Sequence, residues 1–417
     1  MPTAQPVNPL AAPVTHPAAR DYLLGATITE QQLLLDPYPV YRSLQEREPV
    51  TWVEELGMWW VVGHAQVTEI LLDDARFATS SPASVIRGTF GMQMLSAEGE
   101  QHARYKRAAR PAFQPQAVRV GFTDAITRLV DELIDGFAGS PGVDLRAAFA
   151  AQLPVRTILH VFGLPQTAAP QLRLWYDVFE KALANFAGNE QIKAAAAASV
   201  AEFHAFLMDG IARVRGKTDG GFLAEMVNQP DERRLSDEEV CRNASIIMFG
   251  GISTVEALIL NSVWTLAMHP QTEARVHQDQ GLLSRVIEEV LRWQSPVQSA
   301  TRYARTDVDF HGHRFRAGDT VNCMLAAANR DPAFLADGER FEIDRNPPPR
   351  HLAFATGSHF CIGLHLARLQ GRIALERLYA RLEGLTVDAP QQHRPRGYEF
   401  RQPDRLPVVW RSRRQAP

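Results

Sequence analysis

Cysteine is scarce in this chain, and the few cysteines form no pattern of pairs. The 417 residues include Cys241, Cys323 and Cys361 and no other cysteine. Their spacing fits neither a zinc finger nor a disulfide framework, so a reducing, cytoplasmic compartment is expected. The net charge of −3 gives no basic surplus for binding a nucleic acid.

Long apolar runs are lacking as well. The longest stretch, residues 244–260, is interrupted by Ser253, Thr254 and Glu256. A membrane-spanning helix needs about 20 consecutive apolar residues, so no membrane anchor is expected. Residues 1–20 are rich in Pro and Ala and lack the basic-then-apolar pattern of a signal peptide. We interpret them as a flexible lead before a single domain over residues 21–417.

That domain is expected to be mainly α-helical with small β-sheets. Residues 51–53 and 58–62 have the pattern of two strands joined by a turn, and residues 301–321 are rich in strand signals. From about residue 103 to residue 281 the chain has mainly helical patterns. Residues 329–353, rich in Pro, Asp and Arg, indicate a long loop.

One helix is expected to be unusually long. Ser236 and Glu239 have the spacing of a capping box, and the helical pattern then continues until His269 and Pro270 end it. At 1.5 Å per residue such a helix would extend roughly 50 Å, enough to cross the domain.

Gly250 and Gly251 interrupt the middle of this helix. Each glycine costs a helix interior about 1 kcal/mol relative to alanine. The pair either makes room for a packed neighbour or opens the helix beside a ligand. In the second case the hydroxyls of Ser253 and Thr254 would stand next to the opening.

A different segment offers a metal ligand. Cys361 stands between Gly357 and Gly363, two residues after His359 and seven after Phe354, just ahead of a helical pattern. A helix N-terminus favours the thiolate, which is the form that ligates metals, and glycines let the backbone approach closely. The alternative is an inert cysteine packed in a turn.

The string Phe354-Ala-Thr-Gly357-Ser-His359-Phe-Cys361-Ile-Gly363 resembles the cysteine loop of the cytochrome P450 superfamily, Phe-x-x-Gly-x-(His/Arg)-x-Cys-x-Gly. Ala355 departs from the glycine that many members carry after the phenylalanine. The resemblance implies a haem b cofactor with Cys361 as the axial iron ligand, and thiolate ligation favours O–O cleavage. It also implies the family's triangular, α-rich fold with a long central helix over the haem.

The long helix resembles the family pattern (Ala/Gly)-Gly-x-(Asp/Glu)-Thr, with Gly250, Gly251 and Thr254 in register. The resemblance implies that they lie where dioxygen binds and that Thr254 helps to deliver protons. Ser253 replaces the usual acid. Either Ser253 with water, or Glu256 after a local distortion of the helix, is the candidate substitute, and use of peroxide is the competing explanation.

Glu289 and Arg292 match the family's Glu-x-x-Arg pair, which shares one helix face and is expected to be a scaffold for the cysteine loop. Haem propionates need charge-assisted donors. The positions that match the family's donors are His102, Lys106, Arg302 and His359. The lysine replaces the usual arginine, and its point charge is expected to make a looser contact.

By resemblance, the reaction inserts one oxygen atom from O2 into a small hydrophobic substrate, by hydroxylation or O-dealkylation. Electrons would come from a separate ferredoxin or flavodoxin with its reductase, and a monomer is expected. The alternatives are a peroxide-dependent peroxygenase and a non-catalytic haem-binding protein. The expected substrate contacts are Ile247, Trp175, Phe179, Val297, Ala300 and Phe400. Trp175 and Phe179, at helical spacing, are also typical of a packed core.

Basic residues near the cysteine side are expected to attract an acidic electron donor, although each alone is as readily an ordinary solvated side chain. They are Arg104, Arg107, Arg110, Arg350, Arg368 and Arg372.

Overall fold

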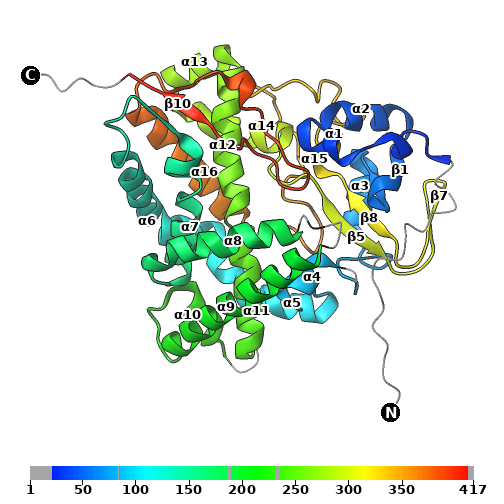
Figure 1. Ribbon diagram of the computed structural model, residues 1–417, viewed down its shortest axis with the longest axis horizontal. Coiled ribbons are helices and arrows are strands. Elements are labelled where there is room, and N and C mark those ends of the chain that lie inside the picture. Colours follow the sequence, from blue (N-terminus) through cyan, green and yellow to red (C-terminus); the bar gives the residue numbers. More distant parts are fainter. Residues whose placement is uncertain (1–20, 83, 184, 186–188, 231–233, 412–417) are drawn as a thin grey trace, which may run out of the picture.

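The computed structural model describes residues 21–411 except residues 83, 184, 186–188 and 231–233. The expected flexible lead, residues 1–20, lies outside the described residues. Most helices gather on one side of the molecule and the main sheet lies on the other (Figure 1). The prediction of a mainly α-helical protein with small β-sheets is confirmed.

The α-helices are α1 (Glu30–Leu35), α2 (Tyr38–Arg47), α3 (His64–Leu72), α4 (Val85–Phe90), α5 (Gly99–Ala109), α6 (Pro115–Asp135), α7 (Leu153–Phe162), α8 (Ala169–Leu183), α9 (Glu190–Val214), α10 (Gly221–Val227), α11 (Asp237–Gly250), α12 (Ser253–Met268), α13 (Pro270–Gln278), α14 (Leu283–Trp293), α15 (Leu325–Ala328) and α16 (Leu364–Arg381). Short helical turns are η2 (Gly25–Thr27), η3 (Glu54–Leu56), η4 (Arg110–Phe113), η5 (Arg146–Ala150), η6 (Gln166–Ala168), η8 (Gln280–Leu282) and η9 (Pro390–Gln392). The strands are β1 (Val50–Val53), β2 (Met58–Val61), β3 (Phe77–Ala78), β4 (Gly142–Asp144), β5 (Ala300–Ala304), β6 (Val308–Phe310), β7 (His313–Phe315), β8 (Thr320–Cys323), β9 (Thr386–Val387) and β10 (Pro407–Val409).

The main sheet has the strand order β1-β2-β8-β5-β3. The predicted hairpin β1–β2 pairs Val53 with Met58, and Gly57 closes its turn at a φ of 61°. In this sheet β2 and β8 are parallel, and the other neighbours are antiparallel. Strands β5 to β8 account for the predicted strand-rich segment. Strand β8 fixes this segment beside β2 of the N-terminal hairpin, whereas β6 and β7 form a separate two-stranded sheet.

A second sheet, in the order β4-β10-β9, joins two distant parts of the chain. Strand β10 pairs with β4 through Val408 and Val143, and beyond the strands Leu145 N–H donates to the Leu406 carbonyl at 2.9 Å. Strand β4 lies inside the region expected to be helical, and no local pattern marked it because its partner is more than 260 residues away in the sequence.

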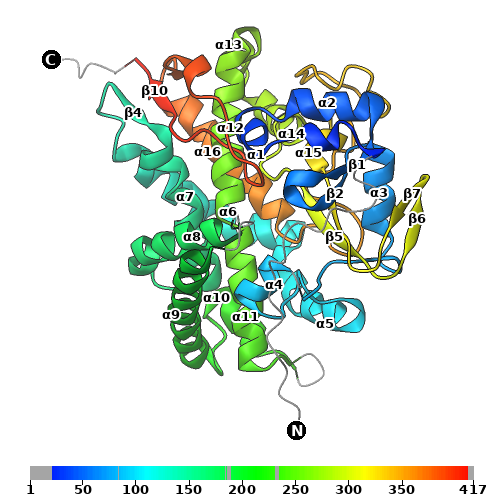
Figure 2. The ribbon, with the colours of Figure 1, turned by 45° about the vertical axis from the view of Figure 1, so that its right-hand side comes forward.

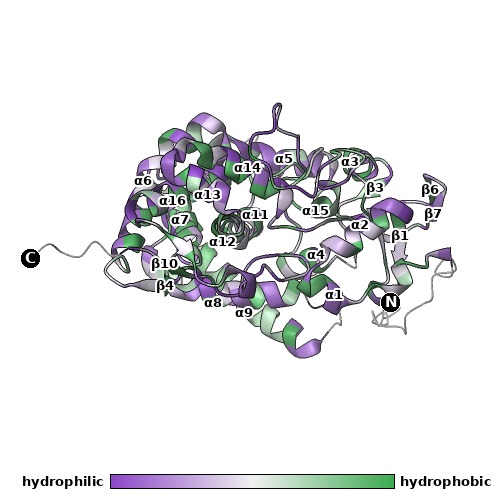
Figure 3. Ribbon diagram, turned by 90° about the horizontal axis from the view of Figure 1, so that it is seen from above, coloured by the Kyte–Doolittle hydropathy of each residue, from purple (hydrophilic) through white to green (hydrophobic). Residues whose placement is uncertain are grey.

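The long helix forms as predicted, with its capping box at Ser236 and Glu239 and its end at His269. It is divided into α11 and α12 by Gly251 and Ile252. Residues 237–268 are apolar and long enough to cross a membrane, but 83% of their most apolar window is buried inside the protein. Figure 3 looks along this helix and places it in the interior.

Helix α16 follows the cysteine loop and packs against α6, α12 and α14. In Figures 1 and 2 it lies beside α12. Helix α8 packs against α9 and α4. The cysteine loop and the opening in the long helix are therefore held by helices that share one hydrophobic core.

Candidate active site

The cysteine loop is fixed by short-range backbone contacts. Cys361 N–H donates to the Phe354 carbonyl at 3.1 Å, which folds the loop back on itself ahead of α16. Gly357 has a φ of +80°, and a Cβ placed there would lie 2.3 Å from the Leu71 carbonyl oxygen. Only glycine fits such a position without displacing backbone. At Gly363 the nearest atom to an added Cβ is the Cys361 sulfur, at 4.0 Å.

The electrostatics of the Cys361 thiol combine two opposing effects. Burial raises its pKa, whereas the backbone N–H groups of Gly363 and Leu364 act to lower it. Lys106 and Arg368 also favour the thiolate. The start of α16 thus points N–H groups and positive charge at the sulfur, as expected for a ligand to a cation.

Phe354 lies under a cation. The Arg368 guanidinium carbon stands 4.6 Å from the centre of its ring, and the ring packs against the main core. The next residue, Ala355, has a φ of 56°. Alanine therefore occupies a left-handed conformation at the position where the family often has glycine.

Three of the four expected propionate donors converge near the loop. The rings of His102 and His359 stack with their centres 4.1 Å apart. The Lys106 ammonium donates to the carbonyl oxygens of Ser358 and Phe360, the latter at 3.3 Å. Burial, and then the neighbouring His102, lower the pKa of His359 to about 3.

Arg302 is the fourth donor. It is 5% exposed, lies on β5, and donates to the Thr301 carbonyl at 2.9 Å. Burial lowers its pKa. Among the described residues, no carboxylate lies within ion-pair distance of Arg302, Lys106, His102 or His359. A buried guanidinium beside several basic groups requires an anion. A group with two carboxylates, such as haem, fits this requirement, and the thiol fits the iron.

Glu289 and Arg292 form a buried bidentate pair on α14, with N–O distances of 2.7 and 2.8 Å. Arg292 also donates to the Asn329 and Gly338 carbonyls at 3.0 and 2.7 Å. Glu289 accepts from Arg345 at 3.3 Å. The pair therefore ties α14 to the loop that leads toward Cys361.

The long helix opens at the glycine pair. Thr254 Oγ1 donates to the Gly250 carbonyl at 2.7 Å, and this hydroxyl bridges the end of α11 and the start of α12. The Cβ of an alanine at Gly250 would meet no atom within 4 Å, whereas at Gly251 it would lie 3.1 Å from the Ile158 side chain. Gly251 makes room for α7, and Gly250 borders open space. Gly251 therefore fits the first interpretation of the pair, room for a packed neighbour. Gly250 leaves the open space that the second interpretation requires.

Two carboxylates stand near the opening, in different environments. Glu256, 1% exposed, is held by Arg146 and Arg173, each at 2.7 Å. Glu180, from α8, accepts a hydrogen bond from Ser253 Oγ. The sequence interpretation considered Glu256 but missed Glu180. The available signal was weak: Arg173 and Glu180, seven positions apart, lie on one side of α8 beside its apolar face.

The expected substrate contacts fall into two groups. Val297 and Phe400 are joined by a β-bridge, and with Ala300 they are half-buried. Phe179 and Ile247 are buried among helices, and Phe179 contacts the ring of Phe90 at 5.2 Å.

Trp175 turns toward α9. Its ring contacts Phe203 and Phe206, and its indole N–H donates to Glu202 at 2.9 Å. These contacts pack α8 against α9, so Trp175 fits the alternative interpretation of a side chain in a packed core.

Comparison with known proteins agrees with this geometry. The sequence model described as Cytochrome P450 matches residues 190–399. Cytochrome P450 monooxygenase PikC of Streptomyces venezuelae is 32% identical, covering 93% of this chain and 94% of its own. The biotin biosynthesis cytochrome P450 of Bacillus subtilis is 27% identical, covering 93% of this chain and 99% of its own.

Solved structures show the same fold. P450BioI in complex with hexadec-9Z-enoic acid ligated acyl carrier protein has a TM-score of 0.84 at 27% identity, covering 92% of this chain and 100% of that one. CYP109E1 from Bacillus megaterium in complex with testosterone has a TM-score of 0.80 at 25% identity, covering 90% and 99%. Haem b with a cysteine thiolate ligand is the cofactor of this family. The chain therefore belongs to the cytochrome P450 family and is a haem-dependent monooxygenase with the family's fold.

Proposed function

We propose that this protein hydroxylates or O-dealkylates a small hydrophobic molecule, using O2 and electrons from a separate ferredoxin or flavodoxin. The observation that carries the proposal is the opening at Gly250, with the Thr254 hydroxyl on its carbonyl oxygen at 2.7 Å. A protein that only binds haem has no need for such an opening. Residues 21–417 would act as one domain, as a monomer in the cytoplasm.

The cofactor would be held from two sides. Cys361 would ligate the iron, and Arg302, His102, Lys106 and His359 would donate to the propionates. When bound, haem supplies the activation of oxygen, and its thiolate ligand favours O–O cleavage. Phe354 would shield the sulfur from water, because its carbonyl accepts from the Cys361 N–H and its ring packs against the main core.

The chain's own residues would then handle protons and exclude water. Thr254 carries a hydroxyl that can both donate and accept a hydrogen bond. In its present geometry it donates to Gly250, so a ligand in the opening would compete for that hydrogen.

An aromatic cluster supports an apolar substrate. It is formed by Phe90, Tyr176, Phe179, Phe249 and Phe400. Phe249 is central to it: its ring stacks on Tyr176 at 5.0 Å and meets Phe400 at 6.1 Å. Phe249 directly precedes Gly250, so the cluster adjoins the opening. Such linings suit hydrophobic ligands. Of the two solved relatives, one is in complex with an acyl carrier protein that carries hexadec-9Z-enoic acid, and the other with testosterone.

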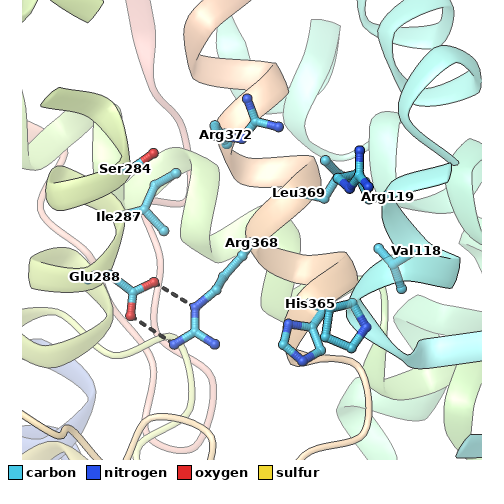
Figure 4. Close-up of a pocket in the computed structure, with 10 residues that line it drawn as sticks. Val118, Arg119, Ser284, Ile287, Glu288, His365, Arg368, Leu369 and Arg372 are labelled. Carbon is cyan, nitrogen blue, oxygen red and sulfur yellow. Dashed lines mark hydrogen bonds and ion pairs between the residues drawn. The ribbon is translucent and has the colours of Figure 1, made fainter. Parts of the chain in front are cut away.

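The surface near the cysteine side supports docking of an acidic electron donor. A pocket of about 300 Å3 lies between α6, α14 and α16, with Arg119, Arg368 and Arg372 among its lining residues (Figure 4). The structure pairs most of the arginines expected here with acids: Arg368 binds Glu288 at 2.6 and 2.8 Å, and Arg372 binds Glu376 at 3.0 Å. Arg104 and Arg107 pair with Glu239 and Glu100.

Arg110 and Arg350 are exposed, and among the described residues neither has an ion-pair partner. They, rather than the paired arginines, would attract the acidic donor. Arg110→Glu with Arg350→Glu is expected to slow reduction by a ferredoxin chain and to weaken its salt dependence.

The test compares two routes on one purified protein. Compounds are first screened for a shift of the haem spin state, and binders are then assayed with a reductase chain and with hydrogen peroxide. Product formed with the chain supports the proposal. Product formed with peroxide alone would support the peroxygenase instead, and product by neither route, despite a bound compound, would contradict both.

A further inference from the structure

Ser253 stands where the family has an acid, and its hydroxyl donates to the carboxylate of Glu180 across the interface between α12 and α8. We infer that Glu180 supplies the missing acid: it is a positioning residue that holds the proton for the oxygen site and passes it through Ser253. The acid is thus carried by a neighbouring helix instead of the long helix. This inference rests on the proposed oxygen-dependent reaction.

The position of Ser253 makes the connection direct. It is the first residue of α12, it is 2% exposed, and it precedes Thr254 in the opening. Two successive hydroxyls therefore face different partners: Thr254 donates to the Gly250 carbonyl oxygen, and Ser253 donates to Glu180. The Glu180 carboxyl group therefore meets the junction of α11 and α12 at the residue next to Thr254, and the Thr254 hydroxyl in turn meets the Gly250 carbonyl beside the open space.

The charges around Glu180 favour a proton-binding carboxyl group. Burial raises its pKa, and the Ser253 hydrogen bond opposes this. Glu256 of α12 and Asp177 of α8 raise the pKa further, and Arg173 lowers it.

Arg173 forms its ion pairs with two other acids, Glu256 at 2.7 Å and Asp177 at 3.1 Å. Among the described residues no cation lies within ion-pair distance of Glu180. Tyr176, one turn away on α8, completes the groups that face it.

Glu256 is the weaker candidate because both of its oxygens are occupied. Arg146 binds Oε1 and Arg173 binds Oε2, and Gln402 also donates to Oε1 at 3.3 Å. A carboxylate fixed by two guanidiniums gives up its negative charge only at a high cost. Its ion pairs favour a structural role.

The proton transfer balances as follows. In its neutral form the Glu180 carboxyl donates to Ser253 Oγ, and the Ser253 proton leaves toward the opening. Glu180 is then ionised and accepts the Ser253 hydrogen bond, which is the arrangement in the structure. Because Glu180 is half-buried, water at the edge of α8 can return one proton to it.

The first test removes the ionisable carboxyl group of Glu180 and keeps the size and shape of the side chain. Glu180→Gln should lower oxygen-driven turnover by about 100-fold, a typical contribution of acid–base catalysis, and divert electrons to hydrogen peroxide. Peroxide-driven turnover and the ferrous–carbonyl spectrum should stay as in the wild type. Glu180→Asp should recover part of the activity. The matched control is Glu190→Gln, an exposed acid of α9 that pairs with Lys193 outside this network, and it should keep wild-type turnover.

The second test moves the acid back to the long helix. Glu180→Gln combined with Ser253→Asp should restore oxygen-driven turnover toward the wild-type value, whereas Ser253→Ala should lower it although Glu180 is intact. If Glu180→Gln keeps full turnover and full coupling of electrons to product, or if the double variant is no better than the single one, the inference is wrong.

A measurement without turnover separates this inference from the proposed function. Infrared difference spectra between the wild type and Glu180→Gln, recorded on the purified protein over a pH series, should show the C=O band of a protonated carboxyl. That band should shift in Ser253→Ala. Its absence at every pH would overturn the inference even in an active enzyme. The band could also be present in a protein that turns over only with peroxide. That result would support the Glu180–Ser253 pair and rule out the oxygen-dependent reaction.

Discussion

The Arg292 guanidinium forms two hydrogen bonds with the Glu289 carboxylate and uses its remaining N–H groups on backbone carbonyls of a distant loop. Those carbonyls belong to Asn329, Gly338 and Arg340. Glu289 in turn accepts the backbone N–H of Glu342 at 2.8 Å. A short segment of α14 thereby organises a loop that contains no helix or strand of its own.

Glu289→Gln is expected to destabilise the protein by about 3–5 kcal/mol, because it leaves the Arg292 guanidinium buried without its counter-charge. Urea unfolding followed by circular dichroism measures this loss. The matched control is Asp344→Asn, which breaks an exposed pair with Arg275 and should cost at most about 1 kcal/mol. Equal losses in the two variants would contradict the structural role of the buried pair.

Ala355→Gly is expected to stabilise the protein by about 0.5–1 kcal/mol. A left-handed conformation costs a non-glycine residue about 1–2 kcal/mol, and the greater freedom of glycine in the unfolded chain returns part of this. Ala353→Gly, in the same loop but not at positive φ, should destabilise instead. The midpoints of denaturant unfolding decide the question, and a loss of stability in Ala355→Gly would refute the strain at φ 56°.

Gly357→Ala should prevent haem binding, because its Cβ would approach the Leu71 carbonyl to 2.3 Å and displace the cysteine loop. Gly312→Ala is the matched control, since Gly312 has a similar φ of +84° and nothing within 4 Å of an added Cβ. The control should lose about 1–2 kcal/mol of stability and keep its haem. The ferrous–carbonyl absorbance per mole of protein measures the difference.

The Glu288 carboxylate should make stability depend on acid pH. Burial acts to raise its pKa, but hydrogen bonds from His351 and Arg368 outweigh burial and lower the pKa from 4.5 to about 2. A depressed folded-state pKa stabilises the protein above the unfolded value of 4.5, and this stabilisation is lost as the pH falls toward about 2.

Glu288→Gln should therefore be less stable than the wild type above pH 5, with a difference that shrinks in more acidic buffer. Thermal unfolding at several pH values measures this, with Arg368→Gln as a second variant that should reduce the dependence on pH. A difference in stability that stays constant across the pH series would contradict the lowered pKa of Glu288.

Local sequence patterns predicted the elements that depend on neighbouring residues. The capping box at Ser236, the end of the long helix at His269 and the β1–β2 hairpin each follow from side chains within a few positions of one another. The cysteine loop is also continuous in sequence, which is why the Phe354–Gly363 string identified the family before the fold was known.

Contacts between distant residues could not be predicted in this way. Glu180 and Ser253 are separated by 73 positions, and Arg146 and Glu256 by 110. Each side chain alone resembles an ordinary surface residue at the sequence level. Only the packing of α8 and η5 against α12 brings these polar groups together, and burial then determines which carboxyl is paired with cations and which is left to bind a proton.

The sheet β4-β10-β9 links the surroundings of the buried Glu256 to a segment more than 260 residues further along the chain than β4. Arg146 Nη1 donates to the Asp404 carbonyl at 3.2 Å, and Leu406 N–H donates to the Asp144 carboxylate at 2.9 Å. One of the two guanidiniums that neutralise Glu256 is therefore anchored by a segment far away in the sequence. The Arg146 guanidinium can be held in this position only after β10 has paired with β4 across more than 260 residues of sequence, a non-local contact of the kind that forms slowly in folding.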